Sequence, residues 1–176
     1  FSRNFEVRAV EMQQGDALKM KGYSVKAIAT NHSVPSIGFA LEEDARPGRF
    51  NRDAAISLGI PPGPLFGRLQ HGQEISVEGR RVLPQQVMGP PRPGRKIVYT
   101  GDTRPCKSVQ IAAEGADLLI HDCALASDMA EWARETRHST AAEAAEIARG
   151  ASVGRLVLTH ISSRYSEDTS VLLSEA

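Results

Sequence analysis

Four short apolar runs in this 176-residue chain each lead into a histidine or an aspartate. The runs and the residues that follow them are 23–30 with His32, 95–100 with Asp102, 116–120 with His121-Asp122, and 155–159 with His160. Alternating or nearly continuous apolar runs of this length are typical of strands, and the continuous ones of strands buried on both faces. We therefore expect strands that deliver polar, chemically useful side chains at their tips.

Helical segments separate these strands in the last third of the chain. We expect helices at about 105–113, 127–135 and 141–149, the last with a capping box formed by Thr140 and Glu143. A further short strand is expected at 36–41, where Gly38 permits a close backbone approach. Strands that alternate with helices predict an α/β fold in which helices cover a sheet.

The pattern breaks between residues 42 and 72, which are rich in glycine and proline. One short helix is expected at about 51–58, and a hairpin follows at 74–77 and 81–83. We interpret 42–72 as an arm or a long loop that leaves the core.

Charge is segregated along the chain although the net charge is zero. Residues 46–107 carry 11 Lys and Arg against 4 Asp and Glu, and nine of those cations are arginine. Any few of them could be a solvated surface, but the asymmetry favours a polyanionic partner, because the planar guanidinium suits phosphate.

Several classes of protein are disfavoured. No run of about 18 apolar residues is present, and nothing resembles a signal peptide, so we expect a cytoplasmic protein without a membrane segment. Cys106 and Cys123 form no C-x-x-C arrangement, which disfavours a disulfide framework or a thiolate zinc site. We expect both to be reduced, buried thiols.

His32, Asp102 and His160 are candidate metal ligands. Imidazole and carboxylate donors suit a zinc ion that keeps an open position for water, whereas closed structural sites favour thiolates. Taken singly, each has an ordinary alternative, because a histidine after a strand is more often a surface residue and aspartate often forms turns.

Together with their neighbours, these residues resemble the ribonuclease Z family of the metallo-β-lactamase superfamily. The resemblance covers about residues 17–170 and rests on five motifs. They are the middle histidine segment at 32–39, the aspartate motif at 99–104, a His-Glu-Ala-Thr-like stretch at 121–124, the His-Ser-Thr motif at 138–140 and the terminal histidine motif at 159–165.

The resemblance implies the C-terminal half of a metallo-β-lactamase αββα sandwich, with 1–176 as part of one domain and 42–72 as an inserted arm. It implies a zinc-dependent endoribonuclease that removes the 3′ trailer of precursor tRNA and assembles as a homodimer. Two zinc ions are implied: His32 would complete the ligands of the first, Asp102 would bridge both, and His160 would bind the second. His138 would be catalytic, contacting the scissile phosphate or protonating the leaving oxygen.

Substrate contacts are implied at two places. Ser162, Ser163 and Arg164 follow a ligand at a possible helix start and would hold phosphate oxygens, although a surface ion pair is an alternative for Arg164. Gly63 and Pro64 match the Gly-Pro element of the family's arm, which grips tRNA far from the cut.

The sequence departs from the family pattern in one major respect, because it contains no His-x-His-x-Asp-His motif. Each metal would then keep at most two protein ligands, so the chain alone is expected to bind zinc poorly and to be inactive. His121-Asp122 also replaces the usual His-Glu, which leaves the role of that acid open. Two alternatives remain, another metallo-β-lactamase-fold hydrolase such as a small phosphodiesterase or arylsulfatase, and a catalytically dead RNA-binding half.

Overall fold

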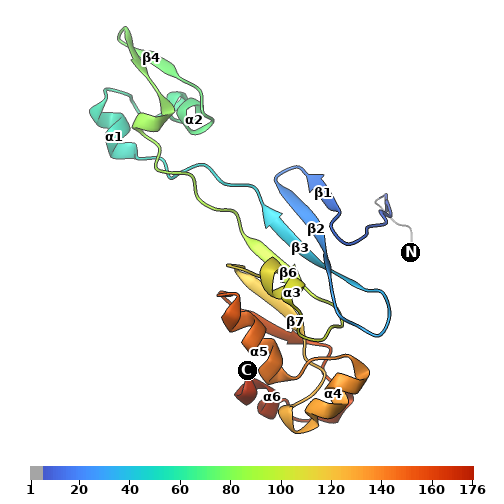
Figure 1. The fold of residues 1–176 in the computed structure, drawn as a ribbon. Coiled ribbons are helices and arrows are strands. Elements are labelled where there is room, and N and C mark those ends of the chain that lie inside the picture. Colours follow the sequence, from blue (N-terminus) through green and yellow to red (C-terminus); the bar gives the residue numbers. More distant parts are fainter. Residues whose placement is uncertain (1–5) are drawn as a thin grey trace. The chain divides into compact units, whose positions relative to one another are not determined.

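A computed structural model of the chain describes residues 6–176 and divides into two compact units (Figure 1). The first unit contains the residues up to Glu43 together with Arg95–Ala176, and the second is Asp44–Gly94. The domain expected at 1–176 therefore includes five residues that lie outside the described part of the chain. The irregular segment expected at 42–72 falls almost entirely within the second unit, which continues to Gly94.

The first unit holds a six-stranded sheet and four helices among its described residues. Its strands are β1 (Ala17–Met20), β2 (Tyr23–Ala29), β3 (Ile37–Glu43), β6 (Lys96–Tyr99), β7 (Leu118–Asp122) and β8 (Leu156–Thr159). Its helices are α3 (Lys107–Ala112), α4 (Ala130–Thr136), α5 (Ala141–Gly150) and α6 (Ser170–Glu175). Single 3-10 turns occur at Ser127–Met129 and Ser163–Tyr165.

The second unit has a small core of its own. It contains α1 (Arg52–Ser57), α2 (Pro64–Gln70), a 3-10 turn at Pro84–Gln86, and a hairpin of β4 (Ile75–Val77) and β5 (Arg80–Val82). Its buried side chains are Ala55, Ile60, Leu69, Ile75, Val82 and Val87. All seven of its basic residues are arginines, against four acidic residues.

Strand direction in the large sheet determines where the site can form. The order is β1-β2-β3-β6-β7-β8, with antiparallel pairing from β1 to β6 and parallel pairing from β6 to β8. Because β3 is antiparallel to both β2 and β6, strands β2, β6, β7 and β8 all run the same way. Their carboxyl ends therefore meet at one edge of the sheet.

One face of this sheet is covered by α3 and α5. Val98 and Leu119 from the sheet pack with Val109 of α3 and Ile147 of α5 in the main core. On the other face Phe39, Tyr99 and Ile120 lie in register on three adjacent strands and remain half-buried or exposed. Gly38 confirms the close approach expected for it, because a Cβ there would lie 2.7 Å from the carbonyl oxygen of Tyr99.

The expected α/β class is confirmed, and the strands and helices expected in the first unit are present with small shifts at their ends. Three elements were not expected from the sequence: β1, α2 and α6. Proline-rich sequence around Gly63 and Pro64 suggested a loop, but Gly63 is the N-cap of α2 and Pro64 its first residue, a position that tolerates proline. Both cysteines are free, but only Cys123 is buried, because Cys106 lies at the partly exposed start of α3.

Candidate metal and phosphodiester site

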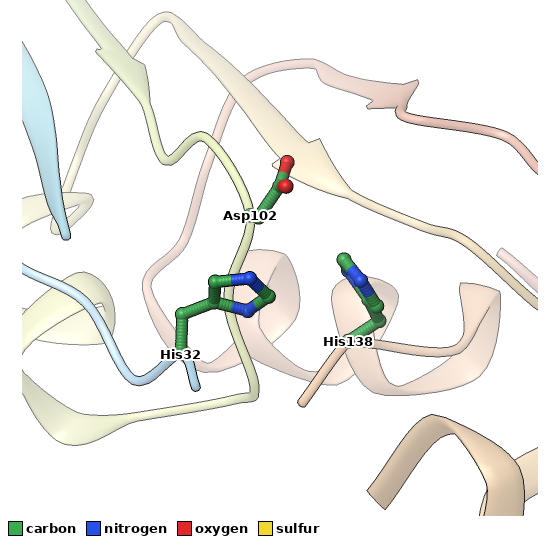
Figure 2. A group of neighbouring side chains, drawn as sticks. All are labelled: His32, Asp102 and His138. Atoms are coloured by element: carbon green, nitrogen blue, oxygen red, sulfur yellow. The ribbon is translucent and has the colours of Figure 1, made fainter. Parts of the chain in front are cut away.

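The sheet edge brings together side chains from four separate segments. His32 follows β2, Asp102 follows β6, His160 follows β8, and His138 lies in the loop between α4 and α5. This loop is held at the same edge, because Ala124 donates its backbone N–H to the Ser139 carbonyl oxygen just beyond β7. Figure 2 shows three of these side chains, His32, Asp102 and His138, next to one another.

Distances within the group are short. One ligand atom from each of His32, Asp102 and His138 lies within 4.8 Å of the other two. The ring centroids of His32 and His138 are 5.0 Å apart, and His138 stacks on His160 with 4.8 Å between centroids. His160 Nδ1 lies 3.5 Å from Asp102 Oδ1. The four side chains expected to carry metal binding and catalysis therefore form one cluster.

The donor types in this cluster fit a zinc or similar ion. Neutral imidazoles and one carboxylate are the ligands found around catalytic zinc. The ligand atoms of a single zinc lie at most about 4 Å apart. The spacing of up to 4.8 Å between these three side chains is slightly larger, so they would have to move closer together to bind one ion. The tightest set contains His138 where the family resemblance assigns His160. His138 differs from His160 in having a buried carboxylate, that of Asp122, as its hydrogen-bond partner.

Asp122 is the principal partner of His138. Its Oδ2 lies 2.8 Å from Nδ1 of His138 and also accepts the backbone N–H of Thr103 at 2.8 Å. Burial raises the pKa of the Asp122 carboxyl, while these two hydrogen bonds act in the opposite direction. A proton on Nδ1 shared with Asp122 leaves Nε2 of His138 as the atom that can exchange a proton or bind a ligand.

A second network joins the loops that carry the site. Arg104 donates to the His138 carbonyl oxygen at 2.6 Å and to the Glu143 carboxylate at 2.7 Å, while its backbone N–H bonds to the Asn31 carbonyl oxygen. It therefore links the segment before His32, the segment after Asp102 and the start of α5. No sequence motif indicated this role.

His160 and Arg137 have left-handed backbones, with φ of 60° and 64°. Non-glycine residues seldom adopt this conformation, although it is common where a helix ends. Arg137 ends α4 and turns the chain into His138, and its carbonyl oxygen lies 3.0 Å from Nδ1 of His32. Nearby, burial raises the pKa of the Cys123 thiol to about 12, so this thiol stays protonated at neutral pH.

The expected substrate residues lie in two different units. Ser162 and Arg164 line a cavity of about 320 Å³ that also contains His138 and His160. Ser162 is the N-cap of the 3-10 turn and Ser163 its exposed first residue. Gly63 and Pro64 are exposed at the start of α2 in the second unit.

Comparison with known proteins identifies relatives over the whole chain. Residues 71–161 match the family described as beta-lactamase superfamily domain. The chain is 53% identical to the ribonuclease Z of Methanosarcina acetivorans over 100% of its own length and 58% of the relative's. It is 52% identical to the ribonuclease Z of Myxococcus xanthus over 99% of its own length and 57% of the relative's. The chain thus spans less than two thirds of these relatives and corresponds to their C-terminal portion.

Two solved structures are also similar to this chain. Human tRNase Z, short form, matches with a TM-score of 0.53 and 27% identity over 86% of this chain and 41% of that chain. The metallo-beta-lactamase fold protein YhfI of Bacillus subtilis matches with a TM-score of 0.59 and 19% identity over 96% of this chain and 48% of that chain, which supports the fold alone. The expected fold and the resemblance to ribonuclease Z are confirmed, and the chain belongs to the beta-lactamase superfamily.

Proposed function

We propose that this chain supplies the C-terminal part of a metal-dependent endoribonuclease that removes the 3′ trailer of precursor tRNA. The observation that carries the proposal is the cluster of His32, Asp102, His138 and His160 at one sheet edge, in a chain 53% identical to a ribonuclease Z. A precursor tRNA is the partner and substrate class.

Metal binding is assigned to His32, Asp102 and His160, and by the resemblance Asp102 would be shared by two zinc ions. When bound, such a pair would activate a water molecule near neutral pH and neutralise charge on the phosphate. His138 is assigned to catalysis rather than to the metal because the resemblance to ribonuclease Z gives it that role. Asp122 holds its Nδ1, so Nε2 is the nitrogen that would act. From Nε2 it would donate a proton to the oxygen that leaves when the phosphodiester bond breaks.

Binding of the RNA is assigned to both units. Ser162, Ser163 and Arg164 lie next to His160, where hydroxyl, amide and guanidinium groups would hold phosphate oxygens. Gly63 and Pro64 belong to the second unit, whose seven arginines favour sequence-independent contacts with a tRNA backbone. Residues 42–72 of that unit remain the proposed arm.

Assembly as a homodimer and a cytoplasmic location belong to the same proposal, and both rest on the resemblance to ribonuclease Z. Within residues 6–176, none of the helices has the length and apolar character needed to cross a bilayer.

The test joins the chain to the N-terminal part of the Methanosarcina acetivorans relative that it does not span. With zinc, this hybrid should cleave precursor tRNA, whereas the 176-residue chain alone should bind zinc weakly and cleave nothing. His138→Ala should slow the hybrid by about 10²- to 10⁴-fold, the range of a general acid. Glu146→Ala is the control, because Glu146 is an exposed residue of α5 in the first unit and has no assigned role.

The outcomes separate the alternatives. Hydrolysis of bis(p-nitrophenyl) phosphate without cleavage of precursor tRNA would indicate another phosphodiesterase of this fold. Binding of tRNA without either reaction would indicate an inactive RNA-binding half. Clear cleavage by the chain alone would contradict the assignment of an incomplete metal site.

A further inference from the structure

A slot beside the His138–His160 pair is lined by Trp132, the one tryptophan in the chain. Its volume is about 320 Å³, and both histidines are among its lining residues. Sequence patterns indicated no role for Trp132, and the proposed metal and proton chemistry does not require it.

The packing of α4 explains why Trp132 borders this slot. Ala133 is completely buried and packs in a cluster with Ala124 and Leu125, so it fixes the inner side of the helix. Trp132 and Thr136 lie one turn apart and both line the slot. Trp132 keeps 47% of its surface exposed, which leaves a large apolar side chain partly in water at the site. Covering that surface would be favourable.

The other lining residues come from a different element. Ile161, Ser162 and Arg164 follow His160, and this segment is held in place where Ser162 donates its N–H to the Ala124 carbonyl oxygen at 3.1 Å. Tyr165 OH accepts the Ala126 N–H at 2.9 Å and fixes the same junction. The slot therefore combines an indole on a helix with a guanidinium on an anchored turn, next to the reacting groups.

We propose that this slot binds a nucleobase of the RNA strand next to the scissile phosphate, with the base stacked on the Trp132 indole. The inference rests on the proposed function, since a base adjoins the cleaved phosphate only if RNA is cleaved here. Single-stranded RNA is commonly recognised by stacking of splayed bases on aromatic and arginine side chains, and every base offers such a face. Arg164 would then contact the adjoining phosphate or the second face of the base.

Because Trp132 is the chain's one tryptophan, its fluorescence reports on this slot directly. Titration of the 176-residue chain with a single-stranded RNA hexanucleotide should quench the emission. A hexanucleotide of the same charge with abasic residues throughout should not. Equal quenching by both RNAs, or none by either, would overturn the proposal, because neither result requires a base at the indole.

Variants test the energetic role of the stack. Trp132→Leu should weaken binding of the labelled hexanucleotide by about 5- to 150-fold, the range of one base–aromatic stack, and should not change binding of the abasic RNA. Trp132→Phe should retain most of the affinity because it keeps an aromatic face. Tyr99→Leu is the matched control, since Tyr99 is similarly exposed at 45% but lies outside the slot. Equal affinities for Trp132→Leu and the unchanged chain would refute the stack.

This binding test needs neither metal nor cleavage. If the hybrid enzyme fails to cleave precursor tRNA while base-dependent quenching persists, the proposed reaction is wrong, and the slot binds a base without a cleaved phosphate beside it. If cleavage occurs without base-dependent quenching, the slot is wrong and the reaction stands.

Discussion

Asp122 has the closest side-chain contact with the proposed catalytic histidine. With Nδ1 of His138 only 2.8 Å away, the carboxylate sets which ring nitrogen carries the proton. It is held in turn by the Thr103 N–H, directly after Asp102. Asp122 therefore connects His138 to the loop that carries Asp102, a proposed metal ligand.

Replacing Asp122 with asparagine tests this coupling. Asp122→Asn keeps the size of the side chain but removes its charge, so the Nδ1–H form of His138 is no longer enforced. We expect kcat of the hybrid enzyme on precursor tRNA to fall by about 10²- to 10⁴-fold, because His138 would no longer be held in the form that transfers a proton from Nε2. KM should change little, because the contact does not involve the RNA. Asp128→Asn, on an exposed turn, should leave kcat unchanged, and an unchanged kcat in Asp122→Asn would exclude the orienting role.

The sequence predicted which side chains form the candidate site but not which side chains hold them in place. His32, Asp102, His138 and His160 were expected to act together, because each follows a strand or belongs to a motif. Asp122 was left without a role, since its contact with His138 depends on how the loop before α5 folds back beside β7. Trp132 carried no pattern of its own, because a half-exposed aromatic residue on a short helix is recognised only from the cavity beside it.

Among the elements, α5 was predicted best because its signals are local. Thr140 accepts the Glu143 N–H and Glu143 accepts the Thr140 N–H, which confirms the expected capping box. Helix α2 was missed because its proline-rich start also fits a loop. The ion pair of Glu143 with Arg104 could not be predicted, because it joins the first turn of α5 to the loop after β6, which are distant in the sequence.

That ion pair predicts a pH-dependent contribution to stability. Burial alone would raise the pKa of Glu143, but its hydrogen bonds with Arg104 and Thr140 outweigh burial and hold the pKa below the usual 4.5. A lowered folded-state pKa stabilises the protein above the unfolded value and loses that effect as the pH falls through the folded value. The contribution should be complete at neutral pH and disappear in acid.

We expect Glu143→Gln to lower the free energy of unfolding at neutral pH by about 1–2 kcal/mol, a modest figure because the pair is partly exposed. Urea denaturation at neutral pH and at about pH 3 checks this, because the difference from the unchanged chain should shrink in acid. Glu146→Gln on the same helix is the control, since Glu146 is exposed and should show little effect at either pH. A difference that does not depend on pH would rule out the charge as its source.

The chain divides into a unit whose sheet carries the candidate metal ligands and an arginine-rich unit. The charge segregation along the sequence anticipated this separation, because seven of the nine arginines between residues 46 and 107 lie in Asp44–Gly94. The boundary of the second unit at Gly94 was harder to predict from the sequence, since residues 73–94 contain a hairpin that resembles the strands of a main sheet. That hairpin instead packs into the core of the second unit, where Ile75 and Val82 are buried with Leu69.

The chain leaves and re-enters the sheet at paired positions, which makes the second unit removable. Glu43 donates its N–H to the Arg95 carbonyl oxygen at 2.9 Å, and the Arg95 N–H bonds to the Glu43 carboxylate at 3.0 Å. A two-residue Asn-Gly turn suits such an antiparallel pair and can replace Asp44–Gly94.

Removal of Asp44–Gly94 should weaken binding of precursor tRNA and reduce the dependence of that binding on salt, because each lost phosphate contact lowers the slope by about one. In the hybrid enzyme, hydrolysis of bis(p-nitrophenyl) phosphate should persist, since the metal ligands proposed in this chain all lie in the first unit. A second variant with the seven arginines changed to glutamine separates charge from shape: it should reproduce the flatter salt dependence while keeping the unit. If both variants bind precursor tRNA with unchanged affinity and salt dependence, the second unit does not grip the substrate.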